Sequence, residues 1–155
     1  MSSNNNQKQN EPIQWVTFRL ADELYGINVM QVQEVLRMPD IAPVPGAQDY
    51  VIGIINLRGN VVTVIDLRNR FGLPSREPDD STRIIIIEAE DQVIGIMVDS
   101  VAEVVELRAS DIETAPSVGN EESARYIQGV CSRGGTLLIL VDLNKLFSDD
   151  EKSFF

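Results

Sequence analysis

Several residue types on which enzymes depend are scarce or missing in this chain of 155 residues. It has no histidine and a single cysteine, Cys131. The lack of histidine excludes Ser-His-Asp and Cys-His arrangements, and one cysteine excludes a CxxC metal site. The glycine-rich phosphate-binding loops G-x-x-x-x-G-K-[ST] and G-x-G-x-x-G are missing as well. The sequence therefore predicts a binding protein with no catalytic centre, no metal and no cofactor.

Long apolar runs are also missing. No stretch approaches the roughly 18 apolar residues of a membrane helix, and residues 1–10 are rich in Asn, Gln and Ser without the apolar centre of a signal peptide. A lone cysteine provides no disulfide framework, which favours a cytoplasmic setting. We expect a disordered tail over residues 1–12, a frayed end over residues 148–155, and no direct membrane insertion.

The charge is strongly negative and unevenly distributed. A net charge of −11 disfavours nucleic acid and anionic lipid as partners, because both attract basic surfaces. Residues 77–113 hold eleven acids and two arginines, a net of −9, whereas residues 56–76 hold four arginines and one aspartate, a net of +3. The basic stretch is either a docking surface or a solvated face, and charge alone favours the solvated face.

The sequence contains an internal duplication. Residues 50–71 read YVIGIINLRGNVVTVIDLRNRF, and residues 126–147 read YIQGVCSRGGTLLILVDLNKLF, at a constant offset of 126 − 50 = 76. Upstream, residues 24–35 repeat as residues 93–104 at an offset of 93 − 24 = 69. Each copy has two β-rich runs joined by a short glycine-containing segment, which is typical of a β-hairpin.

The repeat predicts an all-β domain over residues 13–147 with a few short helical turns. Its halves cover approximately residues 13–75 and 82–147. About ten short strands give two small barrels, and five strands bury too little surface alone, so the halves should pack tightly, with an exchange of strands between them compatible with this packing. The glycines of the hairpins, such as Gly53 and Gly59, would supply tight turns or close backbone approaches.

Two carboxylates hold matched positions in the duplicated units. Asp66 and Asp142 each follow the second β-rich run and precede a short helical pattern. They are either catalytic acids or helix N-caps, and their matched place before a helical turn favours capping. Paired acids elsewhere lie in polar loops and are interpreted as solvated charge.

The segment from Met30 to Met38 is compatible with two structures. It forms either an amphipathic helix or a helical turn followed by a strand in which Val35 faces the core. Both alternatives leave Glu34 off the main core face. Three prolines within residues 39–45 exclude a long helix beyond this point.

Four segments resemble the CheW family of bacterial chemotaxis coupling proteins: FRLADELYGI, VQEVLR, PVPGAQDYVIGIINLRG and VVTVIDLRNRF. The similarity covers about residues 14–146, and NLRG followed by VIDLR is highly specific. The resemblance implies two intertwined SH3-like five-stranded β-barrels and no enzymatic activity. It also implies an adaptor that couples the CheA histidine kinase, through its regulatory domain, to the cytoplasmic hairpin tip of methyl-accepting chemoreceptors in membrane-associated arrays.

The resemblance also implies a set of partner-binding residues. The family's glutamate falls on Glu34 and the arginine of NLRG on Arg58, with Val32 and Val35 flanking the glutamate. In the second copy NLRG becomes SRGG at residues 132–135, so the arginine moves by one position and only the first copy should carry the motif.

Simpler interpretations of the same residues remain open at this point. Glu34 can pair with Arg37 three residues on, and Arg58 can be an ordinary turn residue. At the level of function, the leading hypothesis is a non-catalytic chemotaxis adaptor. A coupler or modulator of a non-chemotactic chemosensory kinase pathway is the alternative within the same fold, and an enzyme or small-ligand barrel is the alternative outside it.

Overall fold

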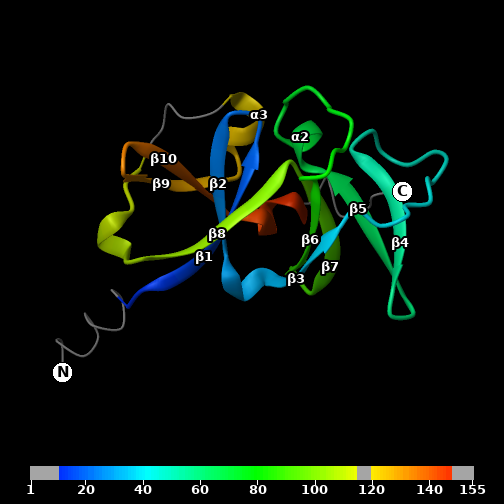
Figure 1. Cartoon of the computed structure of the whole chain (residues 1–155), viewed down its shortest axis with the longest axis horizontal. Helices are drawn as coiled ribbons and strands as arrows, with labels where there is room; N and C mark the ends of the chain where they lie inside the picture. The colour runs from blue at the N-terminus through cyan, green and yellow to red at the C-terminus, as the bar shows by residue number, and fades with distance from the viewer. Residues whose placement is uncertain (1–10, 115–119, 148–155) are drawn as a thin grey trace.

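The computed structural model describes residues 11–114 and 120–147, which form two five-stranded sheets (Figure 1). The strands are β1 (Ile13–Leu20), β2 (Glu23–Asn28), β3 (Val32–Arg37), β4 (Val51–Leu57), β5 (Asn60–Asp66), β6 (Arg83–Ala89), β7 (Gln92–Val98), β8 (Ser100–Leu107), β9 (Ile127–Arg133) and β10 (Thr136–Val141). The short helices are η1 (Val29–Gln31), α2 (Leu67–Arg70), η2 (Ala109–Asp111), α3 (Glu121–Ala124) and η3 (Leu143–Phe147), where η marks a 3-10 helix. The predicted all-β fold is confirmed. Apart from residues 11 and 12, the two predicted tails lie outside the described residues.

Each sheet combines strands from both halves of the duplicated sequence. One sheet, barrel A, has the strand order β8-β1-β2-β10-β9, and the other, barrel B, has the order β3-β6-β7-β5-β4. The sheets lie side by side along the long axis of the molecule (Figure 1). Barrel B is one continuous stretch of chain, whereas the strands of barrel A come before and after it. In each barrel one pair of strands, β2 with β10 and β5 with β7, is parallel.

The two barrels share the same register. The parallel pair Thr63↔Ile94 of barrel B corresponds to Ile139↔Tyr25 of barrel A through the offsets of 76 and 69. The ladders β3 with β6 and β8 with β1, which lie at equivalent edges of the two sheets, contain a register shift at the corresponding position. The duplication in sequence is therefore a duplication in structure.

Neither barrel is closed by paired strands alone. In barrel B the segment after β3 crosses to β4 through an isolated bridge, where Ala42 N donates to Ile54 O at 2.9 Å and Ile54 N donates to Ala42 O at 2.8 Å. In barrel A the equivalent bridge joins Glu113 to Val130, with both hydrogen bonds at 2.8 Å. Each predicted barrel is thus a curled sheet with one bridge across its open side.

Three apolar clusters hold the sheets together. The central cluster takes residues from both sheets, whereas two smaller clusters fill the interiors of barrel A and barrel B. Strand β6 contains a continuous apolar run because both of its faces pack against apolar clusters. Ile85 and Ile87 face the central cluster, and Ile84 and Ile86 face the interior of barrel B. All four are fully buried, as expected for a strand covered on both faces.

The matched aspartates cap short helices. Asp66 Oδ1 accepts a hydrogen bond from Arg68 N at 3.1 Å at the start of α2. Asp142 Oδ1 accepts one from Asn144 N at 3.0 Å at the start of η3. The capping interpretation of both residues is therefore correct.

The arginine-rich stretch over residues 56–76 is not a free basic face. All four of its arginines contact groups of this chain: Arg58 with Glu34, Arg68 with Asp99, Arg70 with the Tyr126 hydroxyl, and Arg76 with Asp79. Three of these partners are carboxylates, which neutralise much of the local positive charge. Within the part of the chain that the structure describes, no helix is long and apolar enough to span a membrane.

Candidate functional site

Strand β3 presents three of the four predicted partner-binding residues, Val32, Glu34 and Val35, on two different faces, and Arg58 lies in the turn between β4 and β5. The helical turn η1 ends at Gln31 and the strand starts at Val32, so the turn-then-strand alternative is the one observed. Glu34 pairs with Ile86, whose side chain faces the interior of barrel B, whereas Val35 pairs with Ile85 on the central-cluster side.

The position of β3 at the edge of its sheet leaves part of the Val32 and Val35 side chains accessible. Strand β3 lies at the end of its sheet, so nothing covers its outer side within that sheet. Val35 is therefore 42% exposed although it lies on the face of the main core. Val32, which pairs with Ile87, is only half-buried at the margin of the central cluster. The structure thus separates the two valines from Glu34 across the strand.

Glu34 and Arg58 form an ion pair across the open end of barrel B. Arg58 Nη1 donates to Glu34 Oε1 at 3.3 Å, and Arg58 Nη2 makes a second, shorter contact with Glu34 Oε2. The side chains are 27% exposed for Glu34 and 68% exposed for Arg58. The hydrogen bond from Arg58 lowers the pKa of the Glu34 carboxyl, and the same bond raises the pKa of Arg58. The pair is a charged surface feature that is accessible to a partner.

The backbone of Arg58 is unusual for an arginine. Arg58 and Gly59 form the turn between β4 and β5 with φ values of 51° and 87°, and Gly134 and Gly135 form the equivalent turn with 53° and 82°. Glycine adopts this left-handed region without steric cost, whereas residues with a Cβ do not. The second repeat uses glycine at a position where the first keeps an arginine. Ala21, Glu90 and Asp91 adopt the same region in other hairpin turns, so an arginine is compatible with this turn, and its side chain pairs with Glu34.

Comparison with known proteins decides the family. Residues 14–151 match the family model described as CheW-like domain. The chain is 38% identical to the chemotaxis protein CheW of Treponema pallidum over 91% of this chain and 85% of that protein. It is 37% identical to CheW of Bacillus subtilis over 89% and 88%. The crystal structure of the scaffolding protein TtCheW from Thermoanaerobacter tengcongensis superposes with a TM-score of 0.83 at 34% identity, covering 94% of this chain and 98% of that one.

The chain belongs to the CheW family. It is a chemotaxis coupling adaptor, as the sequence predicted, and a role in a non-chemotactic pathway is not favoured. CheW is a scaffold family, so its site is a surface for partners. Within the described residues of this CheW-family chain, no group of three or more His, Cys, Asp or Glu residues could hold a metal ion.

Several surface residues near the site were missed by sequence reasoning. Met30 in η1 is 86% exposed, and Val61 in β5 is largely exposed beside an apolar hollow of about 450 Å³ lined partly by Ile41 and Ile54. A useful signal was present in the repeat. Exposed Val104 and Leu137 occupy the positions of Val35 and Val61 at offsets of 69 and 76, so each barrel of this CheW-family chain repeats the same exposed apolar positions.

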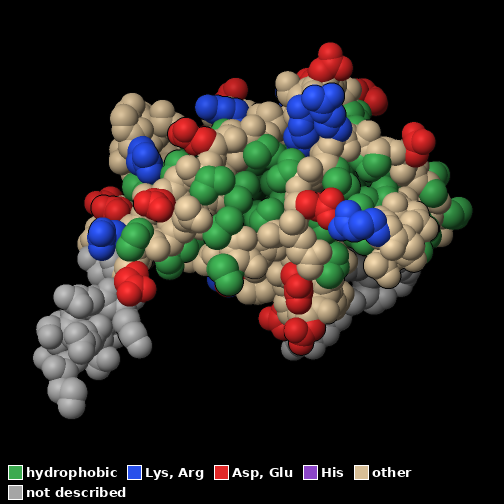
Figure 2. Space-filling model, turned by 60° about the horizontal axis from the view of Figure 1, so that its bottom comes forward, with side chains coloured by type: hydrophobic (Ala, Val, Ile, Leu, Met, Phe, Trp, Pro, Cys, Tyr) green, Lys and Arg blue, Asp and Glu red, His purple; other side chains and the backbone are tan. Residues whose placement is uncertain are grey.

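Figure 2 shows how the exposed side chains are distributed on one face of this CheW-family chain. Apolar side chains gather over the middle of that face, and many acidic and basic side chains lie toward its margin. A contiguous exposed apolar area rimmed by charge is typical of a protein-binding surface.

Proposed function

We propose that this CheW-family chain couples the regulatory domain of the CheA histidine kinase to the cytoplasmic hairpin tip of methyl-accepting chemoreceptors. It acts in the cytoplasm at membrane-associated receptor arrays, without catalysis and without a cofactor. The two faces of β3 serve the two partners: Glu34, with Arg58 from the turn between β4 and β5, binds the kinase, and Val32 and Val35 bind the receptor. The observation that supports this division is the separation of an accessible ion pair from exposed Val35 and half-buried Val32 across one edge strand.

Charge favours the Glu34 and Arg58 face for the kinase contact. A partner barrel that places its own charges against this pair can exchange ion pairs with it, and a like-charge contact across an interface is strongly unfavourable. The neighbouring hollow beside Val61 adds apolar area to the same end of barrel B. Together they give an interface with an apolar part and a charged rim.

Apolar exposure favours the valine face for the receptor. A helical hairpin presents apolar side chains at intervals of three and four residues, and such a stripe docks onto an apolar groove. Val35 and Met30 offer exposed apolar surface, and Val32 continues that surface toward the central cluster. The face does not depend on the ion pair, so both partners can bind one molecule together.

Charge reversal tests the kinase assignment. We expect Glu34→Lys and Arg58→Glu each to abolish most receptor-dependent activation of the kinase, while the change in melting temperature stays within about 3 °C because the pair is exposed to solvent. Binding of each variant to the isolated regulatory domain, kinase activity in reconstituted arrays, and thermal unfolding are the measurements. Restored kinase activation in the variant that carries both Glu34→Lys and Arg58→Glu would indicate that the two residues act through their mutual ion pair. Failure of this double variant would indicate direct contacts with charges of the partner.

A matched variant separates the two faces. Val35→Ser should weaken binding to a receptor cytoplasmic fragment and leave binding to the regulatory domain unchanged. Normal kinase activation by both charge-reversal variants would contradict the site assignment. Mutual exclusion of receptor fragment and regulatory domain in a competition experiment would contradict the two-face arrangement.

A further inference from the structure

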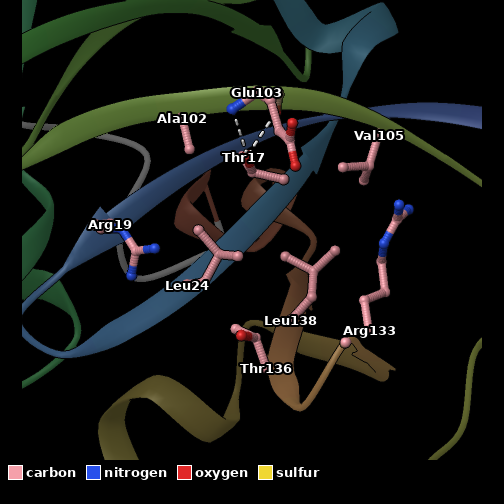
Figure 3. A pocket seen from close by; sticks show the side chains of 10 residues that line it. Thr17, Arg19, Leu24, Ala102, Glu103, Val105, Arg133, Thr136 and Leu138 are labelled. Atoms are coloured by element: carbon pink, nitrogen blue, oxygen red, sulfur yellow. Dashed lines mark hydrogen bonds between the residues drawn. The ribbon is translucent and has the colours of Figure 1, made fainter.

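The interior of barrel A opens to the surface through a cavity of about 560 Å³. Its apolar lining includes Leu24, Val105 and Leu138, and its rim includes the side chains of Arg19 and Arg133. Figure 3 shows the two arginines on opposite sides of the opening, with the two leucines between them. This volume lies within the range of about 300–1,000 Å³ that ligand-binding pockets occupy.

The cavity occupies the position in barrel A that the Glu34 and Arg58 pair occupies in barrel B. Through the offsets of 69 and 76, Glu103 corresponds to Glu34 and Gly134 to Arg58. The backbone is the same at both places: Gly134 and Arg58 have φ values of 53° and 51°. In barrel A, however, glycine provides no guanidinium to pair with Glu103.

A side-chain hydrogen bond between the neighbouring strands β3 and β6 of barrel B is also missing from barrel A. In barrel B, Gln33 Nε2 donates to Glu88 Oε2 at 3.0 Å. The corresponding residues are Ala102, which has no polar side-chain atom, and Arg19. Barrel A thus lacks the counterparts of both side-chain contacts of barrel B, and its cavity lies at the corresponding positions.

The arginines at this opening have no partner within the described chain. Arg19 and Arg133 make no ion pair and no side-chain hydrogen bond to any other described residue. Unpaired arginines stand out in a protein with a net charge of −11, in which the arginines of the stretch 56–76 are all engaged. The two positive charges of Arg19 and Arg133 exceed the single negative charge of Glu103 at the same rim, so the opening is locally positive.

We propose that the open end of barrel A is a binding site for a peptide segment of a partner protein that carries an acidic residue next to a large aliphatic one. The acidic side chain pairs with Arg133 and Arg19, as the Glu34 carboxylate pairs with Arg58 in barrel B. The aliphatic side chain enters the cavity and contacts Leu24 and Leu138. The structure of barrel B supports this choice of ligand. There the corresponding opening is closed by Glu34, whose carboxylate is carried on an aliphatic stem. The site lies on the other barrel from the proposed kinase contact and does not depend on it.

The chain carries its own reporter for this site. Trp15 is the only tryptophan, and it packs in the same apolar cluster as Val105 and Leu138, which line the cavity. Its Nε1 is buried without a hydrogen-bond partner among the described residues. An occupant that presses on the cavity floor should therefore change the fluorescence of Trp15.

The test titrates the full chain with blocked tetrapeptides while Trp15 fluorescence and backbone amide NMR shifts are recorded. The probes are acetyl-Ser-Glu-Leu-Ser-amide and its Leu-Glu isomer, with the Gln-Leu and Glu-Gly peptides as matched controls. We expect saturable binding of an acidic-aliphatic peptide, shift changes centred on β1, β2 and β10, and affinity at least about tenfold weaker for each control peptide. Binding should also weaken as salt is raised.

Variants assign the effect to the opening. Arg133→Glu and Arg19→Glu are exposed changes that should keep the fold and weaken binding at least about tenfold, whereas Arg58→Glu on barrel B should leave peptide binding unchanged. Equal binding of the Glu-Leu and Gln-Leu peptides would overturn the proposal. So would shift changes centred on barrel B, or no saturable response to either acidic-aliphatic peptide.

Discussion

Replacing Gly53 with aspartate should lower the free energy of unfolding by about 3–4 kcal/mol. A Cβ at this position would lie 2.2 Å from Ala42 O and 2.8 Å from Ile41 Cγ2. Ala42 O accepts the hydrogen bond from Ile54 N in the bridge that closes barrel B. The clash is with backbone, so it is relieved only by moving the crossing segment and breaking that bridge. Urea and thermal unfolding followed by circular dichroism measure the loss.

Gly59→Asp is the matched control. Gly59 has a φ of 87°, but nothing lies within 4 Å of the Cβ that would be added there. Only backbone strain is expected, about 1 kcal/mol, because aspartate tolerates the left-handed region better than most residues. The two glycines look equivalent in the sequence, and the structure predicts different outcomes for them. Equal losses in the two variants, or a Gly53→Asp variant as stable as the parent, would contradict this explanation.

Asp99→Ala should destabilise the protein by about 2–4 kcal/mol. Asp99 lies between β7 of barrel B and β8 of barrel A, and it receives a bidentate ion pair from Arg68 Nε and Nη2 at 2.7 and 2.6 Å. Ala21 N, in the turn between β1 and β2, donates to Asp99 Oδ2 at 2.8 Å. The side chains of Arg68 and Asp99 are only 11% and 12% exposed. Removing the carboxylate would leave the buried Arg68 guanidinium without its charge partner.

The same group gives an acid-dependent contribution to stability. Burial works to raise the pKa of Asp99, but the hydrogen bonds from Arg68 and from the Ala21 N–H outweigh it and lower the pKa overall. A carboxyl whose folded pKa lies below its unfolded value, about 4, stabilises the fold above that pH and loses this contribution as the pH falls through the folded value. The stability difference between the parent and Asp99→Ala should therefore be full near neutral pH and shrink below about pH 4.

Glu34→Gln is the control for this second prediction. It also removes one carboxylate from an arginine, but Arg58 remains largely exposed and is solvated by water. Its melting temperature should therefore not differ measurably from that of the parent. Two results would show that the Arg68 and Asp99 pair does not stabilise the junction between the two barrels. One is a loss of unfolding free energy in Asp99→Ala no greater than that in Glu34→Gln. The other is a loss that stays constant between neutral and acid pH.

Local pattern accounts for the parts of the structure that the sequence predicted. Alternation and turn residues identify the hairpins, and the constant offsets identify the two barrels. The caps at Asp66 and Asp142 follow from their place before helical turns, and the family motif singles out Glu34 and Arg58. Each of these inferences uses residues that are close in the chain or match an established motif.

Three features depend on long-range packing and leave no local pattern. The Arg68 and Asp99 pair joins residues 31 positions apart, and although Arg68 lies in the VIDLR motif, nothing local to either residue identifies the other as its partner. The exposure of Val35 follows from the edge position of β3, which strand composition does not reveal. The opening in barrel A is lined by Ala102 on β8 and Gly134 in the turn between β9 and β10, which are distant in the chain and meet only in the folded barrel.

The assignment of strands to sheets has a consequence for the order in which the two barrels can fold during synthesis. All five strands of barrel B are contiguous and have been synthesised once Val98 leaves the ribosome, whereas β2 cannot meet β10 until the last strand has been made. The first barrel in the sequence is thus the last to be completed. A cut in the linker between α2 and β6 would give each fragment one sequence repeat but no complete sheet. The repeat of the sequence and the five-stranded sheet of the structure are therefore different segments of this chain.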